Sequence, residues 1–336
     1  MMRTNRLFAL GATLLVALAA CSSTGSSSAP SAAASAAAPS TAASVAPSVA
    51  PSVAPSEGPK ADIRIGSDNF YESKLMAELY AQALEAAGYK VTRNLGLGSR
   101  QDRAPAFEAG QVDLVPEYVG SGLGYYNKQL ITGAGETNKN SLQAVLAAKG
   151  NLATVLGITP GEDTNAAVVR QDTATAMTLA KMSDLAAHQD DLRWGLPPDC
   201  DANPLCKGAL ETYGIKYPPK QREALAACDA PIATALQGNA IDFAWLCSTQ
   251  PAIAQNGFVV LEDDLDTQPA ENIAPLVRND YLAKVDATAF AAILDAVSAK
   301  MTTEELTKLG VKVGVDNEDV ADVAKQWLTD QGLLSS

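Results

Sequence analysis

The chain has 336 residues, with 25 Lys and Arg against 38 Asp and Glu, and its formal net charge is −13 at pH 7. This acidic balance disfavours nucleic acid as a partner, and no basic cluster contradicts it. The stretch from Ala61 to Ser336, roughly 275 residues, exceeds one small core, and we expect it to form two lobes.

The first twenty residues predict a lipoprotein signal peptide. Arg3 and Arg6 precede an apolar run from Leu7 to Ala20, and small residues lead to Cys21. Cys21 is then the lipidated residue, and lipid rather than a membrane-spanning helix anchors the chain. The alternative is an ordinary signal peptide in which Cys21 stands by chance. Residues 21–60, rich in Ser, Ala and Pro, predict a disordered tether after the lipidated cysteine.

The next segment alternates strand and helix patterns. We expect a strand at 61–65, a helix at 73–87 ending at Gly88, a strand at 90–97, a helix at 101–109 and a strand at 112–115. Strands separated by helices of this length predict parallel pairing and an α/β fold. Pro116 should end the last strand because proline has no N–H to donate.

The same alternation returns at 165–169, 174–187, 230–236, 241–246 and 258–261. Helices then follow at 287–300, after a capping box at 302–305, and at about 317–330. This tail has no strands of its own, so we expect it to pack on an earlier lobe.

Ligands bind open parallel sheets beyond the carboxyl ends of the strands. Glu117, Tyr118 and Ser121 follow Pro116 and therefore fall at such an end. The alternative is that the Tyr118 ring only covers the core and binds no ligand.

Signatures of catalysis are weak. The single histidine, His188, stands among charged residues, and no nucleophile elbow or phosphate loop occurs in the sequence. The glycine-rich stretches 96–98 and 120–124 are interpreted as turns, and the acidic run 262–264 as a solvated loop. We therefore expect no enzyme activity, no cofactor and no metal, and favour a protein that closes on a small ligand by hinge motion.

Four further cysteines predict two disulfides, since oxidation is permitted in an exported chain. Three pairings are possible. We favour Cys200 with Cys206, which closes a short loop, leaving Cys228 with Cys247. A zinc site is the rival interpretation, although the paired C-x2-C spacing of such sites is absent.

Several motifs resemble the osmoprotectant substrate-binding proteins of ABC importers, the quaternary-ammonium-binding family that captures glycine betaine, choline or carnitine. The sequence IGSDNF at 65–70 is similar to the family's I-G-S-K-N-F, and VDLVPEYVG at 112–120 is similar to its I-D-L-Y-P-E-Y-T-G. Weaker matches follow at 84–91, 213–214, 235–236, 241–242, 248–249, 259–264 and 274–278. Together they cover nearly all of the predicted folded part.

The resemblance implies a two-lobed, periplasmic-binding-protein-like (type II) α/β fold with two hinge crossings. Lobe 1 is then formed by residues 61–158 plus 262–336, and lobe 2 by residues 159–261. Crossings are expected near 156–159 and 260–264, with the ligand between the lobes.

The resemblance also implies a ligand site. Tyr118 matches a tyrosine of the box that holds the cation on ring faces, Ser121 a hydroxyl position, and Asp163 an acidic position near the cation. The remaining expected ligand-binding residues are Ser67, Asn69, Asn165 and Thr249.

Other family positions differ in this chain. Tyrosines expected near Asn165 and Ala233 are absent, as is an arginine expected between Cys200 and Cys206. Aromatic residues that could replace the lost rings are Tyr71, Trp194 and Trp245, and each could equally belong to the core.

These features predict an extracytoplasmic receptor, anchored by lipid to the cell membrane, for a small zwitterionic or cationic solute. Its partners would be that solute and the transmembrane permease subunits of an ABC importer, and we expect a monomer. The alternatives are an exported enzyme using carboxylates such as Glu117, Asp163 or Asp199, the binding domain of a sensor, and a structural lipoprotein.

Overall fold

The computed structural model describes residues 58–129 and 131–334. The predicted signal peptide, Cys21 and most of the predicted tether lie outside these residues. Within the described ranges, none of the helices combines the length and the apolar character needed to cross a membrane.

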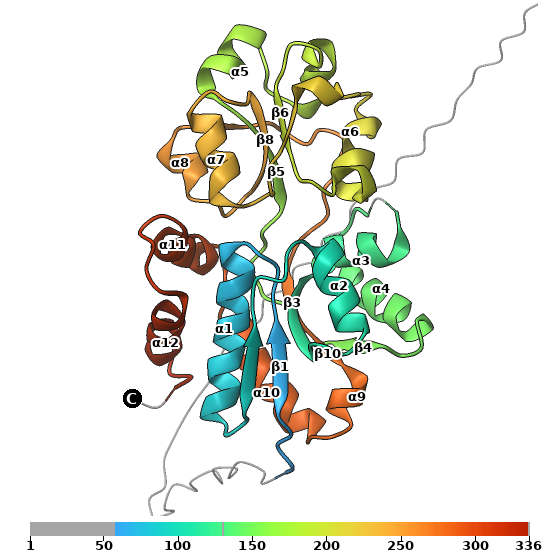
Figure 1. Ribbon diagram of the computed structural model, residues 1–336, viewed down its shortest axis with the longest axis vertical. Coiled ribbons are helices and arrows are strands. Elements are labelled where there is room, and N and C mark those ends of the chain that lie inside the picture. Colours follow the sequence, from blue (N-terminus) through green and yellow to red (C-terminus); the bar gives the residue numbers. More distant parts are fainter. Residues whose placement is uncertain (1–57, 130, 335–336) are drawn as a thin grey trace, which may run out of the picture. The chain divides into compact units, whose positions relative to one another are not determined.

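The described chain forms ten strands and twelve α-helices (Figure 1). The strands are β1 (Ile63–Gly66), β2 (Val91–Asn94), β3 (Leu114–Tyr118), β4 (Ala153–Val155), β5 (Asn165–Val169), β6 (Trp194–Leu196), β7 (Arg222–Ala224), β8 (Phe243–Cys247), β9 (Val259–Val260) and β10 (Ile273–Arg278). The helices are α1 (Tyr71–Ala86), α2 (Arg100–Glu108), α3 (Val119–Asn127), α4 (Gly135–Ala148), α5 (Gln171–Met177), α6 (Ala209–Thr212), α7 (Ala230–Gln237), α8 (Ala252–Gln255), α9 (Asn279–Leu282), α10 (Ala287–Ser298), α11 (Thr303–Gly314) and α12 (Val320–Asp330). Short 3₁₀ turns lie at Met182–His188, Cys200–Ala202 and Pro219–Gln221, and a π-turn at Pro204–Gly208.

The strands form two five-stranded sheets, in the orders β2-β1-β3-β10-β4 and β7-β6-β8-β5-β9. This is the expected α/β class, but the expectation of parallel pairing is right only in part. β10 runs antiparallel to β3 and β4, and β5 runs antiparallel to β8 and β9. The reason is that β10 does not enter its sheet through a βαβ crossover, which parallel neighbours need. It arrives directly from the other sheet.

The first sheet is covered on both faces, as the alternation of its strands requires. In β3, Leu114 and Tyr118 lie in the cluster formed with α1, α10, α11 and α12, whereas Val115 lies in the cluster formed with α2, α3 and α4. In β10, Ile273 and Val277 join the first cluster and Ala274 and Leu276 the second.

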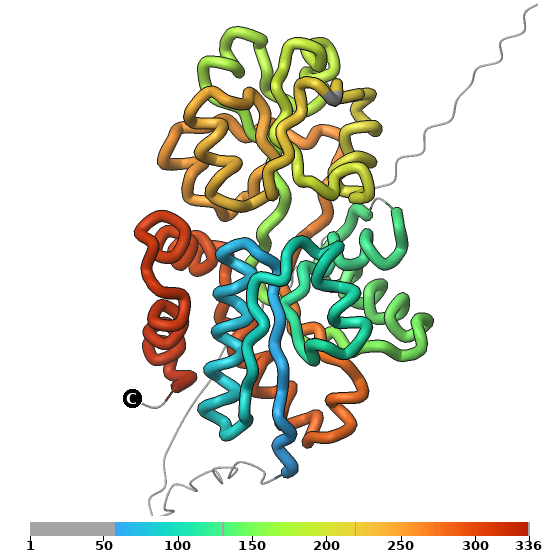
Figure 2. Tube along the Cα trace, viewed as in Figure 1, coloured from blue at the N-terminus to red at the C-terminus, as the bar shows by residue number. Residues whose placement is uncertain are grey.

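The second sheet follows the same rule. Ala167, Val169, Phe243 and Trp245 pack on one face, and alternate residues of the same two strands pack on the other against α7. Figure 2 shows the chain passing from the elements of the first sheet to those of the second and returning to the first in its last part. Each sheet has its own core.

The C-terminal helices α10, α11 and α12 pack along α1, as the predicted lack of strand partners suggested (Figure 1). The capping box expected at 302–305 is present in part, since Thr302 Oγ1 accepts a hydrogen bond from the Glu305 N–H. The tail is thus part of the core of the first sheet.

Pro116 does not end β3, contrary to the sequence-based expectation. The strand continues to Tyr118, and Pro116 lies opposite Pro275 of β10. An antiparallel ladder alternates hydrogen-bonded and non-bonded pairs, so a pair in which neither residue can donate fits the second kind.

Residues 120–124 are likewise helical and not a turn, because they form the first half of α3. Their glycines serve close packing. A Cβ on Gly120 would lie 2.5 Å from Pro269 Cγ, and one on Gly122 would lie 2.9 Å from Glu117 Cγ.

The predicted helix at 174–187 is divided in two. α5 ends where Thr178 adopts a positive φ of 57°. The Asp184 carboxylate then accepts hydrogen bonds from the N–H groups of Ala180 and Lys181, which starts a separate 3₁₀ turn.

Two segments connect the sheets, from β4 to β5 and from β9 to β10. The acidic run in the second segment is not merely solvated, as the sequence suggested. Asp263 accepts hydrogen bonds from Tyr213 Oη at 2.5 Å and from Thr267 Oγ1 at 2.9 Å, and Asp264 accepts one from Ser183 Oγ at 2.7 Å. These bonds fix the start of the connection from β9 to β10, called the return segment below, to the elements of the second sheet.

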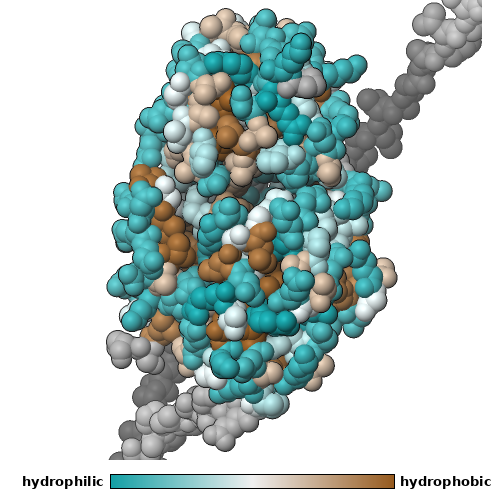
Figure 3. All heavy atoms as spheres, in the orientation of Figure 1, coloured by the Kyte–Doolittle hydropathy of each residue, from teal (hydrophilic) through white to brown (hydrophobic). Residues whose placement is uncertain are grey.

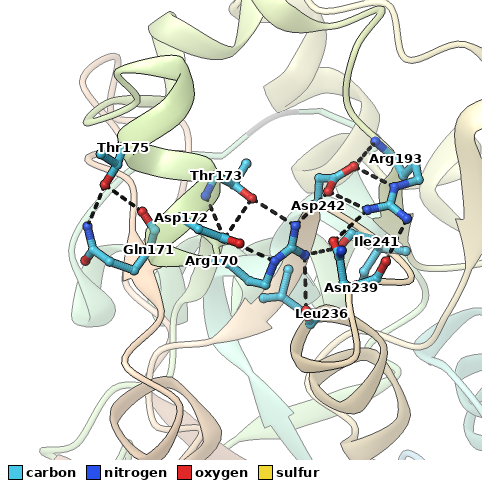
Figure 4. A network of polar contacts seen from close by, with 10 residues as sticks. All are labelled: Arg170, Gln171, Asp172, Thr173, Thr175, Arg193, Leu236, Asn239, Ile241 and Asp242. Carbon is cyan, nitrogen blue, oxygen red and sulfur yellow. Dashed lines mark hydrogen bonds and ion pairs between the residues drawn. The ribbon is translucent and has the colours of Figure 1, made fainter.

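A polar network closes one end of the second sheet (Figure 4). The Asp242 carboxylate accepts hydrogen bonds from Arg170 Nη2 at 2.8 Å and from Arg193 Nε at 2.7 Å. Burial opposes ionisation of Asp242, but the bonds from Arg193 and Arg170 outweigh it and lower its pKa to about 2. The network joins the ends of β5, β6 and β8.

Polar side chains cover most of the face shown in Figure 3, with smaller apolar areas among them. Among the described residues, the large apolar side chains that remain well exposed are Val260 and Leu265, at 49% and 51%. Both lie in or near the return segment.

Candidate functional site

A cavity of about 500 Å³ is lined by residues that follow strands of both sheets. The first sheet contributes Asn69 and Phe70 after β1, Tyr118 at the end of β3, and Ser121 in α3. The second sheet contributes residues after β6 and β7 and the end of β8. This is the position that open α/β sheets offer to ligands.

Three aromatic side chains form part of the wall, namely Phe70, Tyr118 and Trp245. The rings of Phe70 and Tyr118 lie 5.7 Å apart between centroids. Tyr118 comes from the first sheet and Trp245 from the second, so each sheet contributes an aromatic residue to the lining.

Glu72, in the first turn of α1, holds the Tyr118 ring in place. Tyr118 Oη donates a hydrogen bond to Glu72 Oε1 at 2.8 Å, and Thr249 Oγ1 lies 2.9 Å from Glu72 Oε2. Burial and the neighbouring Glu72 raise the pKa of the Tyr118 phenol. Tyr118 therefore stays neutral, with its hydroxyl committed to Glu72.

Asp163 lies in the first connecting segment, is 3% exposed and lines the cavity. Its Oδ1 accepts hydrogen bonds from the Thr249 N–H at 3.0 Å and from Ser248 Oγ at 3.4 Å, and lies 2.8 Å from Thr249 Oγ1. Its Oδ2 is buried without a hydrogen-bond partner among the described residues. Burial raises the pKa of Asp163, against the stabilising effect of these bonds.

A second ionic cluster lies on the other face of the first sheet. Glu117 accepts hydrogen bonds from Arg100 Nε and from Arg103 Nη2, both at 2.9 Å, and Arg103 Nε donates to Asp68 at 2.7 Å. Burial opposes ionisation of Glu117, but the two arginines outweigh it and lower its pKa. Two cations and two anions thus neutralise one another.

Arg100 also donates from Nη2 to Ser121 Oγ at 2.7 Å, which brings a guanidinium to the cavity wall. Beside it, the buried Glu271 accepts a hydrogen bond from the Gly120 N–H at 3.1 Å, whereas its Oε1 has no partner within the described chain. Burial raises the pKa of Glu271 to about 7.

The structure forms the two disulfides favoured from the sequence, Cys200–Cys206 and Cys228–Cys247. Cys228 and Cys247 line the cavity, and their sulfurs lie within 4.8 Å of an Asp163 oxygen. Because both sulfurs belong to a disulfide, they do not offer thiolates to a metal ion.

The structure places most of the expected ligand-binding residues at this cavity. The lining includes Asn69, Tyr118, Ser121, Asp163 and Asn165. Ser67 and Thr249 are buried instead, outside the lining. Thr249 bonds to Asp163, whereas the Ser67 hydroxyl donates to the Asp68 carbonyl and accepts from the Gly96 N–H.

Of the three aromatic residues considered as replacements, Trp245 lines the cavity. Trp194 lies in the core of the second sheet, and Tyr71 lines a separate cavity of about 240 Å³ with residues of α7 and α8.

Sequence reasoning missed Glu72, Arg100 and Glu271 as members of the site. Glu72 follows the strand-end motif at 65–70 by two residues, which was an available signal. Arg100 depends on how α2 packs on β3, and Glu271 on how the return segment meets α3. No local pattern reveals either contact.

Comparison with known proteins gives a consistent result. Residues 61–330 match the family described as the substrate binding domain of ABC-type glycine betaine transport systems. The glycine-betaine-binding protein of Pseudomonas aeruginosa is 28% identical over 81% of this chain and 88% of its own length. The glycine betaine-binding protein YehZ of Escherichia coli is 27% identical over 80% of this chain and 90% of its own.

Among solved structures, a glycine betaine/carnitine/choline ABC transporter protein is similar in fold. It has a TM-score of 0.62 and 22% identity, and the match covers 82% of this chain and 100% of that one. This likeness supports the two-lobed, type II periplasmic-binding-protein fold. The chain belongs to the family of substrate-binding domains of ABC-type glycine betaine transport systems.

Proposed function

We propose that this protein is a lipid-anchored, extracytoplasmic receptor that captures a solute with a quaternary ammonium group and delivers it to the permease of an ABC importer. Residues 61–158 plus 262–336 form one lobe and residues 159–261 the other. The solute lies between them, in the cavity lined by Tyr118 and Asp163.

One observation carries this proposal: Asp163, whose buried Oδ2 has no hydrogen-bond partner among the described residues, lines a cavity together with Phe70, Tyr118 and Trp245. A methylated cation neither donates nor accepts ordinary hydrogen bonds, and aromatic faces and a nearby negative charge stabilise it. Arg100 and Ser121, on the same cavity, supply donors for a carboxylate or hydroxyl on the solute. The relatives named for glycine betaine binding support the same class of ligand.

Calorimetric titration of the purified protein tests the class of ligand. Glycine betaine, choline and carnitine are compared with 3,3-dimethylbutan-1-ol, the uncharged isostere of choline. At least one of the three quaternary ammonium compounds should bind, and the neutral alcohol should bind at least ~30-fold more weakly than choline, since the site selects charge as well as shape. Equal binding of choline and its isostere, or no binding of any of the three quaternary ammonium compounds, would contradict the proposal.

Delivery and anchoring need separate tests. Cys21→Ser should release the protein from the membrane fraction of cells while leaving solute affinity unchanged, because the folded part is intact. Uptake of labelled solute should then fall in proportion to the receptor lost from the membrane. Unchanged uptake would favour a sensing role.

A further inference from the structure

A single hydroxyl stands between two buried carboxyl groups at the cavity. Thr249 Oγ1 lies 2.9 Å from Glu72 Oε2 and 2.8 Å from Asp163 Oδ1, and all three residues are at most 3% exposed. A hydroxyl carries one proton, so it donates to only one of two oxygens. The other short contact therefore needs a proton of its own.

The surrounding bonds indicate which carboxyl group carries that proton. Asp163 Oδ1 already accepts the Thr249 N–H, which stabilises a charged carboxylate. Glu72 accepts a bond from Tyr118 Oη to its Oε1, and its other neighbour is the Asp163 carboxyl group, a contact that favours a proton on Glu72. A proton on Glu72 Oε2 would complete a chain in which Tyr118 donates to Glu72, Glu72 to Thr249, and Thr249 to Asp163.

We propose that Glu72 is a protonated carboxylic acid in the folded protein and acts as a positioning residue, so that the cation site carries the single negative charge of Asp163. This inference rests on the proposed function only for the identity of the ligand. The titratable groups around Glu72 include Asp163 from the connecting segment, Tyr118 from β3 and Tyr71 from α1. Burial and the neighbouring Asp163 raise the pKa of Glu72, which agrees with the geometry.

The protonation state of Glu72 determines which ligand charge the site favours. With both carboxyl groups ionised, the site would carry two charges and favour dications. With Glu72 neutral, the charge at the site matches one quaternary ammonium. Glu72 then determines the charge of the ligand without contributing charge itself.

Infrared difference spectroscopy of the free protein at neutral pH tests the proton directly. The carbonyl band of protonated carboxylic acids should lose one group's intensity in Glu72→Gln, while the contribution of Glu271, whose pKa is about 7, remains in both proteins. Glu78→Gln is the matched control, because Glu78 is also buried on α1 but forms a salt bridge with Arg93 Nε at 2.7 Å. The same decrease in Glu78→Gln, or no decrease in Glu72→Gln, would overturn the proposal.

Solute affinity gives a second readout. A glutamine amide at position 72 can donate to Thr249 and accept from Tyr118, as the protonated acid does. Glu72→Gln should therefore keep the affinity for choline or glycine betaine within ~3-fold, whereas Asp163→Asn should lower it ~30-fold or more. An equal loss in both variants would show that Glu72 is ionised.

The two readouts separate the inference from the function on which it rests. The infrared band needs no ligand, so it decides the state of Glu72 even if no quaternary ammonium binds. Binding without the acid band would leave the function standing and reject the inference. If Glu72→Gln does not fold, the acid band is measured in Glu271→Gln at pH 8: its presence supports a protonated Glu72, and its absence rejects the inference.

Discussion

Glu117 and Tyr118 are neighbours on β3, yet they enter opposite faces of the sheet and opposite kinds of polar cluster. Glu117 meets Arg100 and Arg103, and with Asp68 the charges of this group cancel. Tyr118 meets Glu72, which leads through Thr249 to Asp163, and no basic residue belongs to this group in the described part of the chain. The first cluster pairs each of its carboxylates with a guanidinium, whereas the second, with Glu72 protonated as we propose, has one negative charge left for a cation from outside.

This difference separates two uses of buried charge. The cluster of Glu117, Asp68, Arg100 and Arg103, called the paired cluster below, anchors α2 to the end of β3. Its net charge of zero lets it lie in the interior. The unpaired carboxylate has the cost of burial without that compensation. A binding protein can carry such a cost because the ligand relieves it.

The largest effect should come from breaking the paired cluster. Glu117→Gln leaves two buried guanidinium groups without their shared carboxylate, so we expect the free energy of unfolding to fall by about 3–5 kcal/mol. Urea denaturation measures it. Glu85→Gln is the control, because it removes only a partly exposed partner of Arg93 and should cost about 1 kcal/mol or less. A similar small loss for Glu117→Gln would mean that the cluster does not anchor α2.

Glu271 lies beside the paired cluster, and its Oε1 has no hydrogen-bond partner among the described residues. Its contribution to the free energy of unfolding should depend on pH. Its pKa rises from 4.5 to about 7 on folding, so the native state binds more protons than the unfolded state between these values. The stability of the protein should therefore fall as pH rises through this window, by up to about 3 kcal/mol. Glu271→Gln removes that loss.

Urea denaturation of both proteins at pH 5 and pH 8 checks this. The variant should be nearly as stable as the wild type at pH 5 and more stable at pH 8. Because the other titrating groups are common to both, their contributions cancel. An equal difference at the two pH values would rule out titration of Glu271.

The smallest expected effect concerns the aromatic wall. Trp245→Leu keeps the side chain apolar but removes a ring face, so affinity for a quaternary ammonium should fall about 5-fold, equal to about 1 kcal/mol. Trp327→Leu is the control, since Trp327 is also buried but packs among the C-terminal helices. Equal affinities in the wild type and Trp245→Leu would remove this tryptophan from the site.

Much of the fold could be predicted from the sequence where periodicity was strong. The strand at 165–169 has the bounds of β5, and the helices at 73–87 and 287–300 lie within two residues of α1 and α10. Two features of the first sheet were not predictable in this way. Pro116 pairs with Pro275, a position at which neither residue needs to donate an N–H, and Gly120 lies in α3 at a place where Pro269 leaves no room for a Cβ.

Part of the site was also predictable from the sequence. Tyr118 was predicted from the motif at 112–120 and Asp163 from the resemblance to the family, and both line the cavity. Glu72 acts through contacts with residues 46 and 177 positions away in the chain. Such contacts exist only after α1 packs on β3 and the second sheet returns to it, so no local pattern could reveal them.

A crystal structure with bound choline or glycine betaine tests the central claim most directly. We expect the trimethylammonium group within about 6 Å of the Tyr118 ring centroid, beside Trp245 and facing Asp163 Oδ2. A solute bound elsewhere, with the Tyr118 ring packed against protein atoms only, would contradict the account.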